Sequence, residues 1–196
     1  TFTYTGTAAP DHILFNNYDG NQTDDLDFID GTTYNASGDI TVSKTISAAG
    51  WATYCSPYAL DFSSTIANLD AAYIVTGGAE GVLAKTEVTG TVPANTGLLL
   101  KGNGDCTIPV VASGTADVAA NKLVGVTSNT EIAANAGYVL MADPSLGFYQ
   151  NSNAFTVGAN TAYLPANFDG SGSAPSFFLL FSLLNSTFTR SNLRIS

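Results

Sequence analysis

The chain has 196 residues and a formal net charge of −10, from 6 Lys and Arg against 16 Asp and Glu. Because 45% of the residues are hydrophobic and only 11% are charged, the composition excludes an acidic disordered chain and can supply a buried core. So few basic residues argue against binding to nucleic acid or to anionic membranes. No apolar run approaches the roughly 20 residues of a membrane-spanning helix. The chain begins at Thr1 without a basic and then apolar leader, so we expect a processed mature chain.

Residues 1–37 combine an alternating segment with an acidic one, and we expect them to belong to the same fold as the rest. Phe2 and Tyr4 alternate with threonines in Thr1–Thr7, which predicts a strand. Carboxylate, amide and carbonyl oxygens, the ligands that Ca²⁺ prefers, gather in the segment that follows, but their spacing departs from the EF-hand pattern. The segment is either a weak calcium site or a solvated acidic loop, and no other cofactor is predicted. Its acidic residues are Asp19, Asp24, Asp25, Asp27 and Asp30.

His12 is the only histidine of the chain, so any Ser-His-Asp, Cys-His or zinc site would have to use it. The chain has no Gly-x-Ser-x-Gly nucleophile elbow and no ligand spacing typical of zinc. No catalytic residue is therefore predicted, and we expect that the protein is not an enzyme.

Residues 38–168 contain short apolar runs separated by Gly, Asn, Asp, Ser and Pro, which is typical of strands and turns. This pattern predicts an all-β fold, a β-sandwich or open barrel of many short antiparallel strands. One turn of helix is expected at Ser63–Asn68. The predicted strands are Ile40–Ile46, Ala52–Cys55, Ala72–Val75, Val82–Val88, Gly97–Lys101, Cys106–Val110, Lys122–Val126, Tyr138–Met141, Gly147–Gln150 and Ala162–Leu164.

Cys55 and Cys106 are the only cysteines. They could form one disulfide in an oxidising compartment, or remain two buried thiols that behave as small hydrophobic residues. The sequence leaves both alternatives open.

One short pattern occurs three times: an apolar residue, a spacer, Ala-Asn, another spacer, a small residue and then an apolar strand. Asn tolerates left-handed backbone angles, so the pattern predicts a tight turn that leads into a strand. The small residue is expected to let two backbones approach closely. The three copies are Val92–Leu100, Ile132–Leu140 and Val157–Pro165.

Several of these segments, in this order, resemble the β-rich modules of secreted and cell-surface proteins of Bacteroidota. The resemblance covers residues 38–168, and it implies an all-β fold, an extracellular or cell-surface location and no catalytic residues. The segments that carry it are Gly50–Phe62, Ala72–Ile74, Val92–Gly102, Gly147–Tyr149 and Ala162–Leu164.

Aromatic residues gather in three places, and sugars stack on flat rings. Burial in the core is the usual position of aromatic residues in a β-domain, so a glycan-binding surface is the alternative. The groups are Trp51, Tyr54 and Tyr58; Phe148 and Tyr149; and Tyr163 and Phe168.

The end of the chain is the most unusual part of the sequence. Residues 169–176 have the Gly/Ser composition of a hinge, and residues 177–196 begin with a strand that is apolar on both faces. Phe177, Leu179, Phe181 and Leu183 would form one face, and Phe178, Leu180 and Leu184 the other. Such a strand has to be enclosed, either in its own domain or in a neighbouring subunit.

These features predict an extracellular structural protein, a filament or pilus-like subunit whose partners are identical copies joined by exchange of a terminal strand. Thr1–Thr7 is a second strand that could be donated. The alternative function is a carbohydrate-binding or adhesin module of the cell surface.

Overall fold

The computed structural model describes residues 40–79, 81–143, 145–168 and 177–180, together with the backbone of three two-residue strands before residue 40. The strands in chain order are β1 (His12–Ile13), β2 (Leu26–Asp27), β3 (Thr33–Tyr34), β4 (Ile40–Ile46), β5 (Trp51–Tyr54), β6 (Ala59–Asp61), β7 (Leu69–Ala79), β8 (Val82–Val88), β9 (Thr91–Val92), β10 (Leu98–Gly102), β11 (Gly104–Val111), β12 (Val124–Val126), β13 (Thr130–Ile132), β14 (Gly137–Met141), β15 (Gly147–Gln150), β16 (Phe155–Val157), β17 (Thr161–Pro165) and β18 (Phe177–Leu179).

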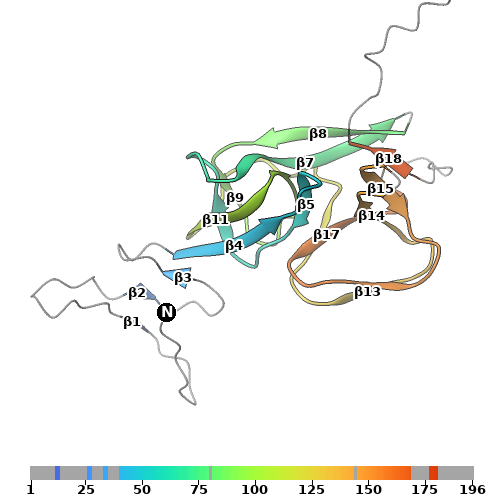
Figure 1. The fold of residues 1–196 in the computed structure, drawn as a ribbon. Helices are drawn as coiled ribbons and strands as arrows, with labels where there is room; N and C mark the ends of the chain where they lie inside the picture. Colours follow the sequence, from blue (N-terminus) through green and yellow to red (C-terminus); the bar gives the residue numbers. More distant parts are fainter. Residues whose placement is uncertain are drawn as a thin grey trace, which may run out of the picture.

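The prediction of an all-β sandwich or open barrel is confirmed (Figure 1). The largest sheet has nine strands in the order β12-β17-β14-β15-β18-β8-β7-β10-β5, and a five-stranded sheet has the order β3-β4-β11-β6-β9. Two small sheets pair β1 with β2 and β13 with β16. Pairing is antiparallel except between β18 and β8.

The helical turn expected at Ser63–Asn68 is wrong, because this segment consists of bends and a turn. The carboxylate of Asp61 accepts a 2.8 Å hydrogen bond from the amide of Ser63, and Asn68 has a positive φ of 64°. Both features favour a local turn over a helix.

Strands β5, β10, β7 and β8 form a wall that separates two hydrophobic cores. Leu98 and Leu100 pack on one side of it and Leu99 on the other, and all three are at most 1% exposed. Ala72 and Ile74 of β7 likewise face the first side, and Val75 faces the second. A strand with a core on each face needs a continuous apolar run, which explains three successive leucines.

The first lobe is the sandwich that this wall forms with β4, β11, β6 and β9. Its core draws on Ile46, Leu60, Val92 and Ile108 from the five-stranded sheet, each at most 2% exposed. Cys106 lies in the same core.

The second lobe is a nearly closed barrel, in which β17, β14, β15 and β18 curve around the other face of the wall (Figure 1). The sheet comes back on itself where β5 lies against β17, and the amide of Cys55 donates a 3.4 Å hydrogen bond to the carbonyl of Asn160 there. The barrel interior holds fully buried side chains from every side, among them Val75, Leu99, Tyr138, Phe148, Leu164, Phe178 and Leu180.

The repeated Ala-Asn pattern forms the same tight turn three times, as predicted. Asn95, Asn135 and Asn160 have φ values of 60°, 61° and 57°, in the left-handed region. Each turn connects two successive strands, β9 to β10, β13 to β14, and β16 to β17.

The small residue after each turn lies in a crowded position. A Cβ on Gly97 would lie 2.9 Å from the carbonyl oxygen of Leu123, and one on Gly137 would lie 3.2 Å from that of Leu164. Ala162 is 4% exposed. Backbone approach therefore leaves no room for a side chain at Gly97 and crowds one at Gly137, in line with the expected small residue.

Candidate self-assembly site

β18 lies between β15 and β8 and is the strand that connects them in the nine-stranded sheet. Its pairing with β15 is antiparallel and covers three residue pairs, Gly147 with Leu179, Phe148 with Phe178, and Tyr149 with Phe177. Its pairing with β8 is parallel and covers one pair, Leu179 with Val82. The amide of Leu179 also donates a 2.7 Å hydrogen bond to the carbonyl of Gly81. The barrel is thus completed by a strand that comes from the far end of the chain.

The inner face of β18 fills the barrel. Phe178 and Leu180 are 1% and 0% exposed. The ring of Phe178 makes edge-on contacts with the rings of Phe168 and Tyr138, at centroid distances of 4.9 and 5.5 Å. Complete burial of a Phe side chain contributes about 2–3 kcal/mol, and edge-on aromatic pairs add to it.

Two glycines make the room that Phe178 occupies. A Cβ on Gly78 of β7 would lie 2.7 Å from Cε1 of Phe178, and a Cβ on Gly147 of β15 would lie 2.5 Å from its carbonyl oxygen. Real Cβ atoms do not come this close, so both positions need glycine while Phe178 is in place. The shape of the barrel wall is therefore matched to this one strand.

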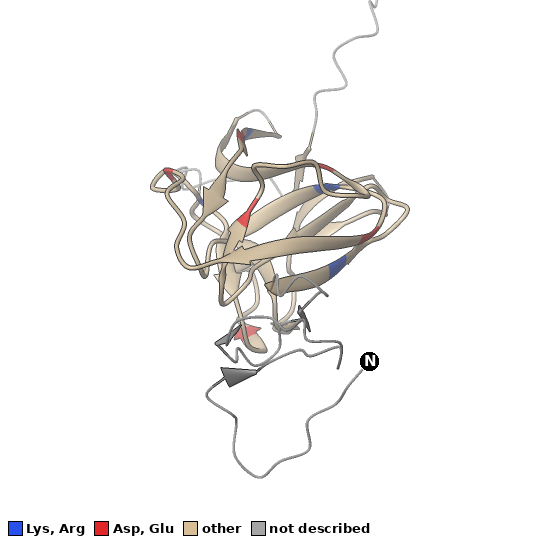
Figure 2. Ribbon diagram, turned by 90° about the vertical axis from the view of Figure 1, so that its left-hand side faces the viewer, with Lys and Arg blue, Asp and Glu red and all other residues tan. Residues whose placement is uncertain are grey.

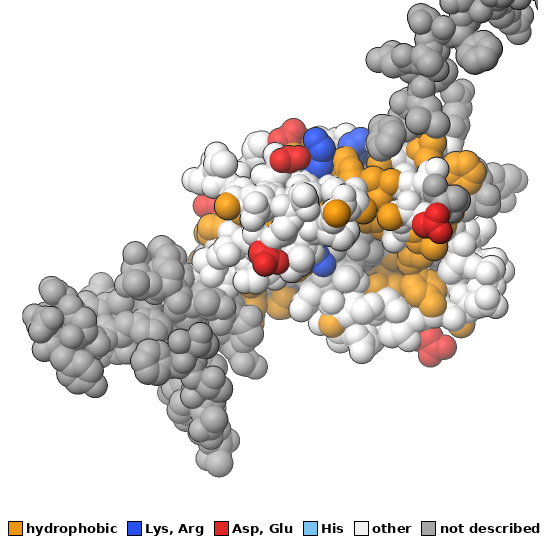
Figure 3. Space-filling view, viewed as in Figure 1, with side chains coloured by type: hydrophobic (Ala, Val, Ile, Leu, Met, Phe, Trp, Pro, Cys, Tyr) orange, Lys and Arg blue, Asp and Glu red, His pale blue; other side chains and the backbone are white. Residues whose placement is uncertain are grey.

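The outer face of β18 is only partly covered. Phe177 is 42% exposed, and its ring stacks on Tyr149 at 5.7 Å with an interplanar angle of 23°. Hydrophobic side chains gather over β18, β15 and β14 in the space-filling view (Figure 3). The expected alternation of faces is confirmed for residues 177–180. Within the described residues Phe177 is only partly covered, so enclosure of this face by a neighbouring subunit stays a prediction. Phe181, Leu183 and Leu184 lie outside the described residues.

Lys85 of β8 fixes the end of the described strand. Its ammonium donates a 2.7 Å hydrogen bond to the carbonyl oxygen of Leu180. The same ammonium lies 5.7 Å from the ring centre of Trp51 and 5.8 Å from that of Tyr73. Burial, and to a lesser degree the charge of Lys101, lower the pKa of Lys85. Lys85 was not predicted as a functional residue, because no local sequence pattern predicts a contact with Leu180, 95 residues further along the chain.

The structure separates the first aromatic group across the wall. Trp51 packs against the second core, whereas Tyr54 and Tyr58 belong to the first. Phe148 is fully buried, and its neighbour Tyr149 points to the outer face, where it contacts Phe177. The third group also divides. Phe168 is in the second core, whereas Tyr163 packs against the small cluster of Val126, Ile132 and Val157. These rings form no single platform.

The structure contains Cys55 and Cys106 as two free, buried thiols and not as a disulfide. Each sulfur has its own packing site. Cys106 lies in the first core. Cys55 packs against Gly125, so closely that a Cβ on Gly125 would lie 2.5 Å from the Sγ of Cys55. Burial raises the pKa of Cys55 to about 11 and also raises that of Cys106.

The acidic segment, interpreted as either a weak calcium site or a solvated loop, lies outside the described residues. This holds for Asp19, Asp24, Asp25 and Asp30, and for the side chain of Asp27, whose backbone pairs with His12. In the part of the chain that is described, no group of three His, Cys, Asp or Glu side chains could hold a metal ion.

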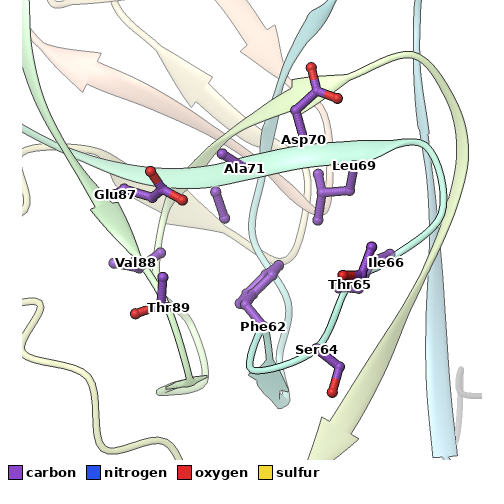
Figure 4. A pocket seen from close by; sticks show the side chains of 11 residues that line it. Phe62, Ser64, Thr65, Ile66, Leu69, Asp70, Ala71, Glu87, Val88 and Thr89 are labelled. Carbon is purple, nitrogen blue, oxygen red and sulfur yellow. The ribbon is translucent and has the colours of Figure 1, made fainter.

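A hollow of about 130 Å³ lies between the start of β7 and the end of β8 (Figure 4). Phe62, Ile66 and Leu69 line it, with Asp70 and Glu87 from the two strands. Figure 4 shows the two carboxylates at separate places on the ribbon, with Asp70 directed away from the hollow. Asp70 forms an ion pair with Lys101 at 3.6 Å.

The comparisons with known proteins give no identification: no family model, no curated protein and no solved structure matches this chain. Within the described ranges, no helix has the length and apolar character needed to cross a membrane. Charged residues are few and scattered over the described ribbon in Figure 2. The fold itself defines a two-lobed β-module whose large sheet is completed by β18, the last described strand.

Proposed function

We propose that this protein is a structural subunit of the bacterial cell exterior that assembles with identical copies by exchange of its C-terminal strand. One observation carries the proposal: β18 completes the sheet between β15 and β8, and it does so from beyond a Gly/Ser-rich segment. We call the position between β15 and β8 the seat of β18. The seat of one copy could receive the β18 of another copy, because main-chain pairing and side-chain pockets recognise the strand irrespective of which chain supplies it.

The energetics of the seat favour exchange over an open barrel. Without β18, two sheet edges lose their hydrogen-bonding partner, and Tyr138 and Phe168 lose the ring of Phe178 that packs on them. Exposed edges and apolar cavities are costly and prone to association. A chain whose own strand is withdrawn therefore gains most by taking an equivalent strand from a neighbour.

The geometry of donation decides the type of assembly. If two copies exchange strands reciprocally, a closed dimer results, whereas head-to-tail donation gives an open filament. The one-pair contact with β8, set against three pairs with β15, makes main-chain pairing weaker on the β8 side, where the strand end is held in addition by the side chain of Lys85. We therefore expect that the strand leaves from this side first.

Support for an extracellular location comes from the sequence. The segments that resemble Bacteroidota modules lie in β5 and β6, in β7, in the β9–β10 turn with β10, in β15 and in β17, and these elements build both lobes. The low charge and the two buried thiols, which need no reducing environment to stay unpaired, are compatible with this location.

Truncation of the chain after Gly172 tests the proposal. The full-length protein should form filaments or discrete oligomers in electron micrographs and by light scattering, and the truncated protein should not. A synthetic peptide with residues 174–184 should bind the truncated protein and raise its melting temperature. A peptide with Phe178→Ser is the matched control and should do neither. Equal assembly of the truncated and the full-length protein would contradict the proposal.

A further inference from the structure

Lys44 occupies a position that the alternation of β4 assigns to an apolar residue. It lies on the same face as Val42 and Ile46, which are 7% and 1% exposed and belong to the first core. The ammonium of Lys44 lies 5.6 Å from the ring centre of Tyr54, itself 5% exposed. A cation is thus placed at the edge of a hydrophobic core, inside a chain with a net charge of −10.

Within the described residues, no carboxylate neutralises this cation. The ion pair among these residues joins Lys101 and Asp70, whereas the ammonium of Lys44 lies over the ring of Tyr54. Burial lowers the pKa of Lys44. A half-buried charge without a counter-ion costs free energy, so the environment of Lys44 favours the binding of an anion from solution.

The space beside Lys44 is large enough for a small ligand. A hollow of about 360 Å³ is lined by Lys44, Tyr54, Pro57 and Tyr58 from the first lobe. Its opposite side is formed by Thr127, which follows β12, and by Ala159 and Asn160 in the turn before β17. Ligand pockets commonly have volumes of roughly 300–1,000 Å³ and lie between domains.

The lining offers groups of three chemical kinds. The ammonium of Lys44 can bind a carboxylate by a charge-assisted hydrogen bond. The ring of Tyr58 and the adjacent Pro57 present flat apolar surfaces. The side chains of Thr127 and Asn160 are exposed and have no hydrogen-bond partner in the described part of the chain, so they can bind hydroxyl groups.

We propose that this inter-lobe pocket binds a sugar that carries a carboxylate, such as a uronic acid residue of an acidic polysaccharide. The carboxylate would lie on Lys44, the pyranose ring against Tyr58 and Pro57, and ring hydroxyls on Thr127 and Asn160. This site is separate from the seat of β18, and the binding does not depend on strand exchange. An acidic peptide would satisfy Lys44 but has no pyranose ring to lie against Tyr58 and Pro57, and a poly-glutamate peptide serves as its probe in the test.

Titration of the full-length protein at neutral pH with glucuronate, glucose and acetate, followed by NMR or calorimetry, tests the proposal. Glucuronate should bind, with shifts at residues of the pocket, and glucose and acetate should each bind at least about tenfold more weakly. Lys44→Met should weaken glucuronate binding about ten- to a hundredfold, with the fold intact by circular dichroism. Tyr58→Phe should retain binding and Tyr58→Ala should lose most of it. Lys101→Met, at an exposed ion pair outside the pocket, is the matched control and should bind as the natural protein does.

Three outcomes would overturn the proposal. Equal affinity for acetate and glucuronate would mean a simple anion site. Tighter binding of a short poly-glutamate peptide than of glucuronate oligosaccharides would mean a peptide site. Undiminished glucuronate binding by the Lys44→Met variant would mean that the sugar binds elsewhere.

Discussion

The ammonium of Lys85 and the carbonyl oxygen of Leu180 are joined by a 2.7 Å hydrogen bond across 95 residues of sequence. The bond connects β8 to the last described residue of the closing strand, on the side where main-chain pairing is limited to one residue pair. The rings of Trp51 and Tyr73 flank the same ammonium. Lys85 therefore compensates for the weak pairing of β18 with β8, and it is the side chain most directly placed to control release of the strand.

Lys85→Gln should loosen β18 without unfolding the rest. The loss of a hydrogen bond from a charged donor costs about 1.5–3 kcal/mol, and partial exposure of Lys85 places this change at the lower end. Amide hydrogen exchange at residues 178–180 should become about tenfold faster, and exchange in the first lobe should not change. Lys101→Gln is the control, and an equal effect of both substitutions would assign no special role to Lys85.

Phe177 and Phe178 are adjacent but have opposite environments, so they form a matched pair. Phe178→Ala should lower the free energy of unfolding by about 3–5 kcal/mol, because it empties a fully buried site between two rings. Phe177→Ala should cost less than about 1 kcal/mol, since this ring is 42% exposed. Urea unfolding curves measure both values, and similar losses would contradict the assignment of faces.

The effect of replacing each of the three turn asparagines on stability should depend on whether the new residue tolerates a left-handed backbone conformation. Asn135→Gly should leave stability nearly unchanged, whereas Asn135→Ala should lower the free energy of unfolding by about 1 kcal/mol, because alanine is strained at a φ of 61°. The same contrast is expected at Asn95 and at Asn160. If alanine and glycine have equal effects in thermal melts, backbone angle is not the reason for asparagine.

Stability at alkaline pH should depend on Tyr54. Burial raises the pKa of its phenol to about 12, from an ordinary value of 10.0. The unfolded chain loses this proton near pH 10 while the folded chain retains it, so the stability that Tyr54 contributes is complete below pH 10 and is lost as the pH rises towards 12. Tyr54→Phe should therefore make the free energy of unfolding less dependent on pH in this interval. An unchanged dependence would show that the phenol ionises freely.

Local chemistry explains which elements could be predicted from the sequence. The strands Ile40–Ile46, Val82–Val88 and Gly147–Gln150 have the predicted bounds, since each is a β-type run between turn residues. The Asn turns followed from the preference of one residue type for one backbone region.

The elements that were missed depend on distant partners. β6, β9, β13 and β16 have two or three residues each, too few for a pattern, and they exist because another strand pairs with them. The roles of two lysines could not be predicted for the same reason. The hydrogen-bond partner of Lys85 is far along the chain, and the pocket beside Lys44 is formed only when the second lobe lies opposite it. The apolar character of the last strand was visible in the sequence, but its seat between Gly78 and Gly147 was not.

The most direct test of strand exchange mixes two variants that cannot assemble alone. One is truncated after Gly172, so it can accept a strand but has none to donate. The other carries Gly147→Val, whose side chain would collide with the backbone of Phe178, so it can donate its strand but cannot seat one. Native mass spectrometry of the mixture should show a 1:1 complex, and each variant alone should be monomeric. A mixture that contains only monomers would contradict the proposal that β18 passes between copies.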